Sequence, residues 1–180
     1  MAVIEAIQTQ VVPTDVTSVS FTLPTSGYQH VYVSWVQRGT LQSTGMTPYL
    51  TLNGNSSNYY RYGWSNYTGS NYDQKANAET SMELGSVVGT SIEGPVMEYG
   101  QVWFYNYRES GSGQYNVGMY WYHMGEWQRS TVTSQQMTSG LRGFLDGSNQ
   151  NALSTIQFFH CCSSNITMGS SFTLYGVKSS

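Results

Sequence analysis

The stretch VTSVSFTLPTSGYQHVYVSWVQ, residues 16–37, decides the fold class of this chain. Val19, Phe21 and Leu23 alternate there with serine and threonine, which is the period-two pattern of a strand that buries one face. The segment HVYVSWV, residues 30–36, repeats the alternation after a short loop. The two runs therefore predict two half-buried β-strands close together in the sequence.

The same alternation recurs along the rest of the chain. Further runs that predict strands are PYLTLNG, VMEYGQVWFYNY, QYNVGMYWYHM, STIQFFHC and SFTLYGV. Asn53-Gly54 closes the first of these runs with a dipeptide that tolerates positive φ at both turn positions, so we expect a tight hairpin there. About eight short strands with almost no helical periodicity predict an all-β fold, namely an antiparallel β-sandwich of jelly-roll-like form.

Length and composition fit one folded domain. A chain of 180 residues can bury a core without disulfides or metal, and its hydrophobic fraction of 39% is too high for a disordered chain. Charged residues make up only 9%, so solubility depends on uncharged polar residues, which is unusual for a free cytosolic enzyme. We expect a single sandwich domain over residues 14–180, preceded by an N-terminal arm over residues 1–13.

Charge and hydropathy argue against two classes of partner. The 7 Lys+Arg residues are scattered singly in a chain of net charge -3, so they form no stripe that follows a nucleic acid backbone. No apolar run approaches the roughly 20 residues that span a bilayer, and the N-terminus lacks the pattern of a signal peptide. We expect neither a nucleic acid nor a membrane partner, and synthesis in a cytoplasm.

The sequence carries no signature of catalysis or metal binding. Motifs of the GxSxG, GxxxxGK[ST], HExxH and DxDxDG kinds are missing, although two carboxylates from distant strands stay open as a hydrolytic alternative. His30, His123 and His160 each lie in an alternating run, where a structural role is expected. Cys161 and Cys162 directly follow His160, whereas zinc ligands are usually spaced by two or more residues. We expect reduced thiols, no metal, no cofactor and no enzymatic activity.

The segment NYYRYGWSNYTGSNYD, residues 58–73, is rich in Tyr, Asn and Gly and has no clean period. It predicts a short strand that leads into a long exposed loop. Aromatic rings with polar edges suit protein interfaces and equally suit stacking on sugars. The candidate residues for a partner or glycan contact are Tyr59, Tyr60, Tyr62, Trp64, Tyr67 and Tyr72.

Three longer segments together resemble one family of proteins. They are VTSVSFTLPTSGYQHVYVSWVQRGT, PYLTLNGNSSNYYRY and LSTIQFFHCCSSNITMGSSFTLYGVK, and the closing GSSFTLYG strand is the most specific of their motifs. In this pattern the chain is similar to virion structural proteins of tailed bacteriophages, including those of cyanophages and other marine phages. The resemblance implies a jelly roll that serves as a capsid decoration or cement protein, a fibre or a tail component, and it brings no catalytic residues.

Our leading hypothesis is a capsid decoration or cement protein that binds the outer capsid surface and reinforces the shell of the virion. Its expected partners are the major capsid protein and copies of itself, as a trimer or another small ring. Because the expected domain occupies nearly the whole chain, the arm is the candidate anchor on the capsid or on a neighbouring subunit. The candidate contact residues in the arm are Val3, Ile4, Ile7 and Val11.

The alternative hypothesis is a receptor-binding module at a tail or fibre tip. In that case the aromatic segment, with Trp64, forms a groove that binds a host glycan. Position in the virion separates the two hypotheses, because a decoration protein lies on the capsid and a receptor-binding module lies on the tail.

Overall fold

The computed structural model describes residues 2–40, 48–56, 59–67, 70–84, 98–108, 119–129, 132–145 and 152–178, with the backbone alone for 60–67, 70–78, 98, 119–129 and 132–145. These residues form twelve strands in two sheets, and all neighbouring strands pair antiparallel. Within this part of the chain, no helix is long and apolar enough to cross a membrane. The predicted all-β antiparallel sandwich is confirmed.

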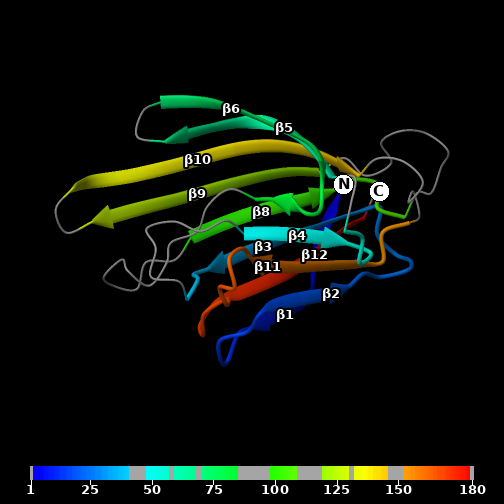
Figure 1. Cartoon of the computed structure of the whole chain (residues 1–180). Coiled ribbons are helices and arrows are strands. Elements are labelled where there is room, and N and C mark those ends of the chain that lie inside the picture. Colours follow the sequence, from blue (N-terminus) through cyan, green and yellow to red (C-terminus); the bar gives the residue numbers. More distant parts are fainter. Residues whose placement is uncertain are drawn as a thin grey trace.

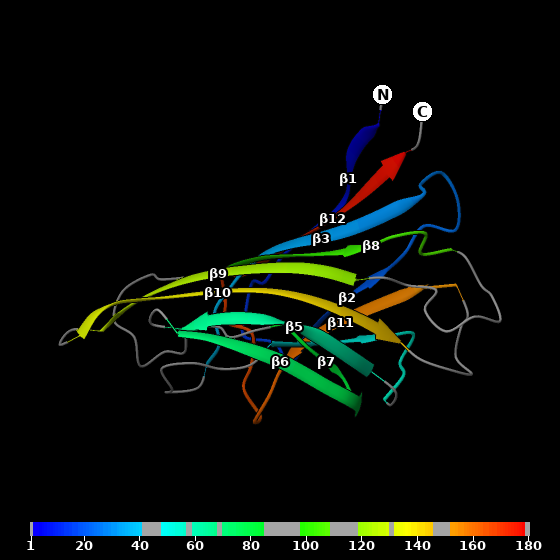
Figure 2. The same cartoon turned by 90° about the horizontal axis from the view of Figure 1, so that it is seen from above.

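The two sheets differ in size. The large sheet has eight strands, in the spatial order β1 (Val3–Val11), β12 (Ser171–Lys178), β3 (His30–Gln37), β8 (Glu98–Phe104), β9 (Met119–Arg129), β10 (Val132–Leu145), β5 (Tyr59–Tyr67) and β6 (Ser70–Glu79). The small sheet has four strands, in the order β2 (Ser18–Thr22), β11 (Thr155–His160), β4 (Pro48–Leu52) and β7 (Met82–Glu83). Figures 1 and 2 show the small sheet packed as a second layer on one part of the large sheet.

The chain crosses repeatedly between the two layers. Strands β1, β12, β3 and β8 form one half of the large sheet, and β2, β11, β4 and β7 form the small sheet, so eight strands make two four-stranded layers. Two hairpins, β5–β6 and β9–β10, extend the large sheet beyond β8 (Figure 2). The described strands outnumber the expected eight because β1, β6, β7 and β10 lack a strong alternation of apolar and polar residues.

The core lies between the two layers and is built from the inward positions of the alternating strands. Phe158 of β11 connects the layers, because its ring contacts those of Phe21, Trp35 and Phe172 at centroid distances of 6.4, 5.5 and 5.4 Å. All four of these rings are fully buried. A Cβ atom at Gly100 would lie 2.2 Å from Cζ2 of Trp35, so β8 passes the indole ring too closely for any side chain at that position.

The turn at Asn53 and Gly54 has the expected backbone, but it does not close the expected hairpin. Both residues have positive φ, 52° and 69°, and the amide of Asn55 donates to the carbonyl of Leu52 at 2.9 Å. The neighbours of β4 are β11 and β7, however, and β5 crosses to the large sheet. The Oδ1 atom of Asn53 instead accepts hydrogen bonds from the amides of Ser154 and Thr155, so the turn is tied to the start of β11.

The segment predicted as an N-terminal arm is part of the sandwich. Val3–Val11 form β1, which pairs with β12 at the edge of the large sheet, and Val12 is buried in the core. The pairing shifts register between Ala6 and Gln8, which leaves Ile7 as an additional residue that packs against the core. Backbone pairing to β12 thus places these residues inside the domain, although their side-chain alternation is weak.

Candidate binding surface

A row of stacked aromatic rings crosses the outer face of the large sheet, which is the face turned away from the small sheet. Tyr175 of β12, Tyr32 of β3 and Trp103 of β8 lie directly opposite one another in the strand register. The ring centroids of Tyr32 and Tyr175 are 4.6 Å apart at an interplanar angle of 7°, and those of Tyr32 and Trp103 are 4.2 Å apart at 17°. We call these three residues the aromatic row.

Stacking determines which parts of the rings remain available to a ligand. Both faces of the Tyr32 ring are covered by its neighbours, so only 9% of this residue is exposed. Its partial burial raises the pKa of the Tyr32 hydroxyl, and the nearby tyrosines add to this effect. Tyr32 therefore presents its ring edge and hydroxyl group to its surroundings, whereas stacking on a sugar requires a free ring face.

The surroundings of the aromatic row are polar but carry no formal charge. Thr173, Ser34 and Gln101 form the next cross-strand row, and Nε1 of Trp103 donates to Oε1 of Gln101 at 3.5 Å. Gln101 also donates to the hydroxyl of Tyr99. Among the described outward side chains of β12, β3 and β8, none carries a carboxylate, ammonium or guanidinium group before the strand ends. The face is therefore suited to uncharged contact.

The register extends the aromatic row along the backbone into the two hairpins. Trp103 lies opposite Tyr120 of β9, and Tyr120 lies opposite Arg142 of β10. Arg142 in turn lies opposite Tyr62 of β5. The predicted residue Tyr62 thus occupies the register position that continues the row, and its side chain lies outside the described part of the structure.

The predicted exposed aromatic loop is a strand pair instead, and one of its residues is buried. Tyr60, Tyr62, Trp64 and Tyr67 are positions of β5, and Tyr72 is a position of β6; only their backbone is described.

Tyr59 contradicts the prediction of an exposed contact residue, because it is only 1% exposed. Its hydroxyl accepts a hydrogen bond from the amide of Leu52 at 2.7 Å and donates to the carbonyl of Asn55 at 3.1 Å. Burial raises the pKa of Tyr59 to about 12. Tyr59 is therefore a core residue that holds the turn after β4.

The four predicted contact residues of the arm are distributed along β1. Val3, Ile4 and Val11 are exposed, by 46%, 54% and 63%, and Ile7 is partly buried against the core. Three of the four thus present apolar surface along β1, one of the two edge strands of the large sheet.

The histidines and cysteines have structural surroundings in the described residues. His160 is buried, with Nε2 3.0 Å from Oε1 of Gln37 and Nδ1 3.3 Å from the carbonyl oxygen of Asn165. Burial lowers the pKa of His160 to about 4, so the ring is neutral at neutral pH. His30 accepts a hydrogen bond from the amide of Asn106, and the side chain of His123 lies outside the described part.

Cys161 and Cys162 are free thiols, as expected from their adjacency. The described residues contain no group of three or more His, Cys, Asp or Glu side chains able to hold a metal ion.

The sequence contains a signal for the aromatic row, although its residues are not among the predicted contact residues. Tyr32, Trp103 and Tyr175 each occupy an outward position of an alternating strand, whereas the outward positions of β2 carry serine and threonine. Their alignment into one row depends on the pairing of β12, β3 and β8, which lie far apart in the sequence.

Comparisons of the chain with family models, with curated proteins and with solved structures gave no match.

Proposed function

We propose that this chain is a bacteriophage virion structural protein of the capsid decoration or cement type, which binds the outer capsid surface through the outer face of its large sheet. The observation that carries the proposal is the aromatic row of Tyr175, Tyr32 and Trp103 on a face without charged groups among its described side chains. Aromatic residues are enriched and charged residues depleted at the centres of protein interfaces.

The strand order supports a virion role through the fold. We take the eight strands of the two four-stranded layers to be a jelly roll, in which the β5–β6 and β9–β10 hairpins are insertions. In support, the layers have the orders β1-β12-β3-β8 and β2-β11-β4-β7, so that each sheet contains strands from both ends of the chain. Double-sheet jelly rolls are recurrent in viral capsid proteins, although they also occur in lectins and cupins. Fold alone therefore does not decide between capsid and glycan partners.

The geometry of the aromatic row favours a protein partner over a glycan. The Tyr32 ring is enclosed between two others at 4.2 and 4.6 Å, which leaves no free face for a sugar ring. A flat strip of ring edges, hydroxyl groups and the Gln101 amide matches the mixture of apolar contact and hydrogen bonding found in protein interfaces. Under this proposal the protein functions by adhesion, without catalysing a reaction.

Binding to capsids tests the proposal directly. Val36 is an outward residue of β3 beside Tyr99, and it is 37% exposed, so Val36→Lys places a charge on the proposed face with little effect on the fold. We expect capsids that lack the native protein to retain about tenfold less of this variant, because an ammonium group would lose its water in the interface. Gln157→Lys, at an exposed position on the outer face of the small sheet, is the matched control and should bind normally.

The salt dependence of binding gives a second measurement. An uncharged interface predicts similar capsid occupancy at low and high ionic strength. A single-particle map of the virion that places this chain on the tail, together with a positive glycan array, would instead support the receptor-binding alternative. Equal retention of Val36→Lys and Gln157→Lys on capsids would exclude the large-sheet face as the contact.

A further inference from the structure

Strand β1 forms one edge of the large sheet, and among the described strands this edge is unpaired and carries apolar side chains. No described strand pairs with β1 on the side away from β12. Ile4 and Val11, near its two ends, are 54% and 63% exposed. The sequence VIEAIQTQV contains no Pro, Lys or Arg, which are residues that natural proteins use to protect long sheet edges. Glu5 is the only charged residue of β1. Its carboxylate forms a salt bridge with Nζ of Lys178 at 2.8 Å and accepts a hydrogen bond from the hydroxyl of Tyr28 at 2.9 Å.

The small sheet offers no comparable edge among the described strands. Strand β7 has only two residues, and β2 has five. The Nε2 atom of Gln10 donates to the carbonyl oxygen of Ser20 in β2 at 2.6 Å, so that a side chain from β1 already satisfies a backbone group of this strand. Strand β1 is nine residues long and lacks such a cap on the side away from β12 in the described structure.

Backbone direction shows which residues of β1 face the free edge. The amide of Val12 donates to the carbonyl of Ser170, and the carbonyl of Val12 accepts from the amide of Gly169, so Val12 faces the β12 side. In an antiparallel strand the direction of the backbone N–H and C=O groups alternates, so those of Val11 and Thr9 point toward the free edge. The additional residue at the bulge shifts this alternation by one. In the other half of the strand the backbone groups of Ala6 and Ile4 therefore point toward the free edge.

These four residues form a self-complementary set. When β1 is placed antiparallel to a second β1, one register sets Ile4 opposite Val11 of the second copy and Ala6 opposite Thr9 of the second copy. Both members of each pair then lie on the outer face, because Ile4, Ala6, Thr9 and Val11 lie opposite the outward residues Val177, Tyr175, Thr173 and Ser171 of β12. Glu5 lies opposite Gln10 of the second copy, so the two Glu5 carboxylates do not face each other.

We propose that two copies of this chain pair antiparallel through β1, with Ile4 opposite Val11, and join their large sheets into one continuous sheet about a two-fold axis. This arrangement replaces the trimer or other small ring expected for a decoration protein with a dimer as the assembly unit. A two-fold axis perpendicular to the joined sheet puts both aromatic rows on the same side. Paired rows strengthen attachment to a repetitive surface, although the pairing itself does not require the proposed capsid role.

The oligomeric state of the full chain tests the pairing. Sedimentation equilibrium over a concentration series should give a reversible monomer–dimer equilibrium for the native chain. Ile4→Lys combined with Val11→Lys places like charges opposite each other twice across the axis, whereas Ile4→Lys combined with Val11→Glu places opposite charges there. We expect the dissociation constant of the Lys/Lys variant to exceed that of the Lys/Glu variant by about tenfold or more.

Val3→Lys is the control, because Val3 is also exposed on β1 but lies on the other face and outside the paired set. This variant should dimerise like the native chain, and far-UV circular dichroism should show a native fold for all variants. A native chain that stays monomeric, a trimer that the substitutions leave unchanged, or equal constants for the Lys/Lys and Lys/Glu variants would each overturn the proposed pairing.

Discussion

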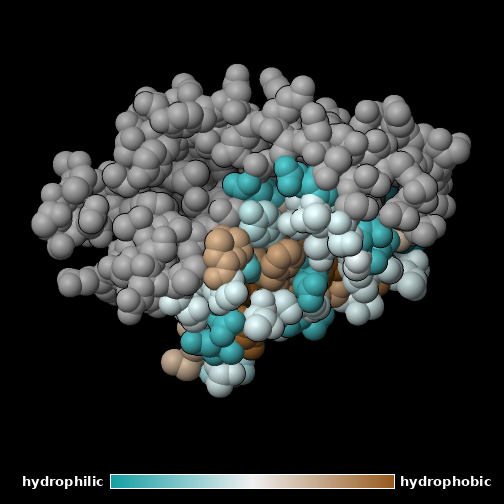
Figure 3. Space-filling view, in the orientation of Figure 1, coloured by the Kyte–Doolittle hydropathy of each residue, from teal (hydrophilic) through white to brown (hydrophobic). Residues whose placement is uncertain are grey.

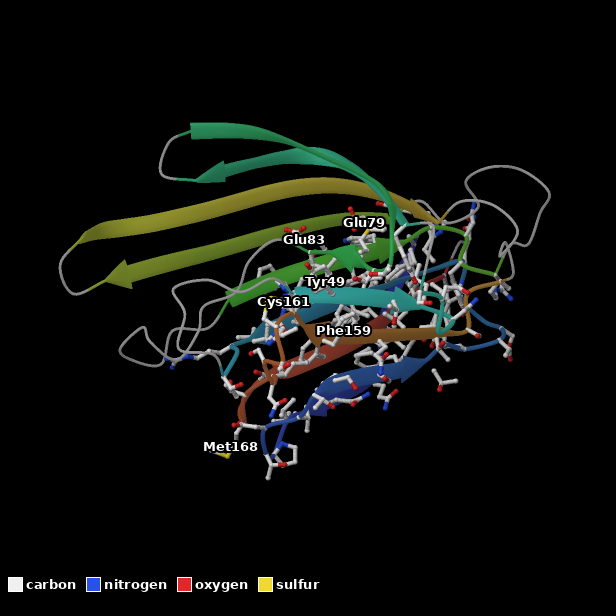
Figure 4. The ribbon with its side chains drawn as sticks, in the orientation of Figure 1. Tyr49, Glu79, Glu83, Phe159, Cys161 and Met168 are labelled. Atoms are coloured by element: carbon white, nitrogen blue, oxygen red, sulfur yellow. The ribbon has the colours of Figure 1, made fainter. Side chains whose placement is uncertain are left out.

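The two outer faces of the sandwich are built on the same backbone but carry different side chains. The outer face of the large sheet holds the aromatic row and the exposed residues Val36 and Tyr99. The outer face of the small sheet is formed mainly by Ser, Thr and Gln, with one stacked ring pair, Tyr49 and Phe159, at a centroid distance of 5.7 Å. Figures 3 and 4 look onto this second face, where hydrophilic and intermediate residues prevail around Tyr49, Phe159 and Glu83.

The difference between the two outer faces shows which side chains the fold itself needs. The inner faces of both sheets are apolar, because the core between them must exclude water. Ser18, Ser20 and Thr22 show that polar residues suffice on the outward positions of a strand. Rings at the equivalent positions of β3, β8 and β12 are therefore not needed to form the sheet, which is the reason for proposing that they form a contact surface.

The largest expected effect is the difference in the free energy of unfolding between substitutions on the inner and on the outer face of β11. Phe158 is 1% exposed and contacts three core rings, so Phe158→Ala should lower the free energy of unfolding by about 4 kcal/mol. Phe159 is its neighbour on the outer face and contacts Tyr49, so Phe159→Ala should cost only about 1 kcal/mol. Urea denaturation of both variants checks the difference, and equal losses would contradict the assignment of the two faces of β11.

A second expected effect depends on pH and concerns the end of the small sheet. The pKa of His160 is lowered to about 4 in the folded state from 6.5, so below pH 6.5 the unfolded chain takes up a proton that the folded chain excludes. The contribution of neutral, buried His160 to the free energy of unfolding is therefore fully present above pH 6.5. It is lost as the pH falls toward 4, and the free energy of unfolding decreases by up to about 3 kcal/mol. Chemical denaturation at a series of pH values checks this loss. His160→Gln should show a shallower pH dependence, and a slope identical to that of the native chain would rule out His160 as its source.

Local alternation predicts most of the strands that build the core, but it does not predict how they pair. β2, β3, β4, β11 and β12 follow from their period-two patterns, and the Asn53-Gly54 turn has the predicted positive φ values. The turn, however, sets only the local direction of the chain, and the next strand joins the sheet where its backbone finds a partner. β5 accordingly pairs with β10, which lies more than sixty residues away in the sequence.

The missed elements and residues share a physical cause. Strands β6 and β10, with the sequences SNYDQKANAE and VTSQQMTSGLRGFL, pair through the backbone in hairpins, so their side chains need not alternate. Tyr59 was predicted to be exposed from the composition of its segment, but the amide of Leu52 provides its hydroxyl with a buried partner. The aromatic row likewise depends on contacts between β12, β3 and β8, which no local pattern contains.

The smallest expected effect is the difference in the free energy of unfolding between substitutions on the two outer faces. Tyr32→Ala removes a ring that is stacked on both sides, so we expect it to lower the free energy of unfolding by about 2 kcal/mol. Tyr49→Ala on the small sheet removes a ring with a single stacked neighbour at 5.7 Å, and about half that loss is expected. Thermal and urea denaturation measure both losses under the same conditions. If the two substitutions cost the same, stacking adds nothing to the rigidity of the aromatic row, and a preformed adhesive strip on the large sheet loses its physical basis.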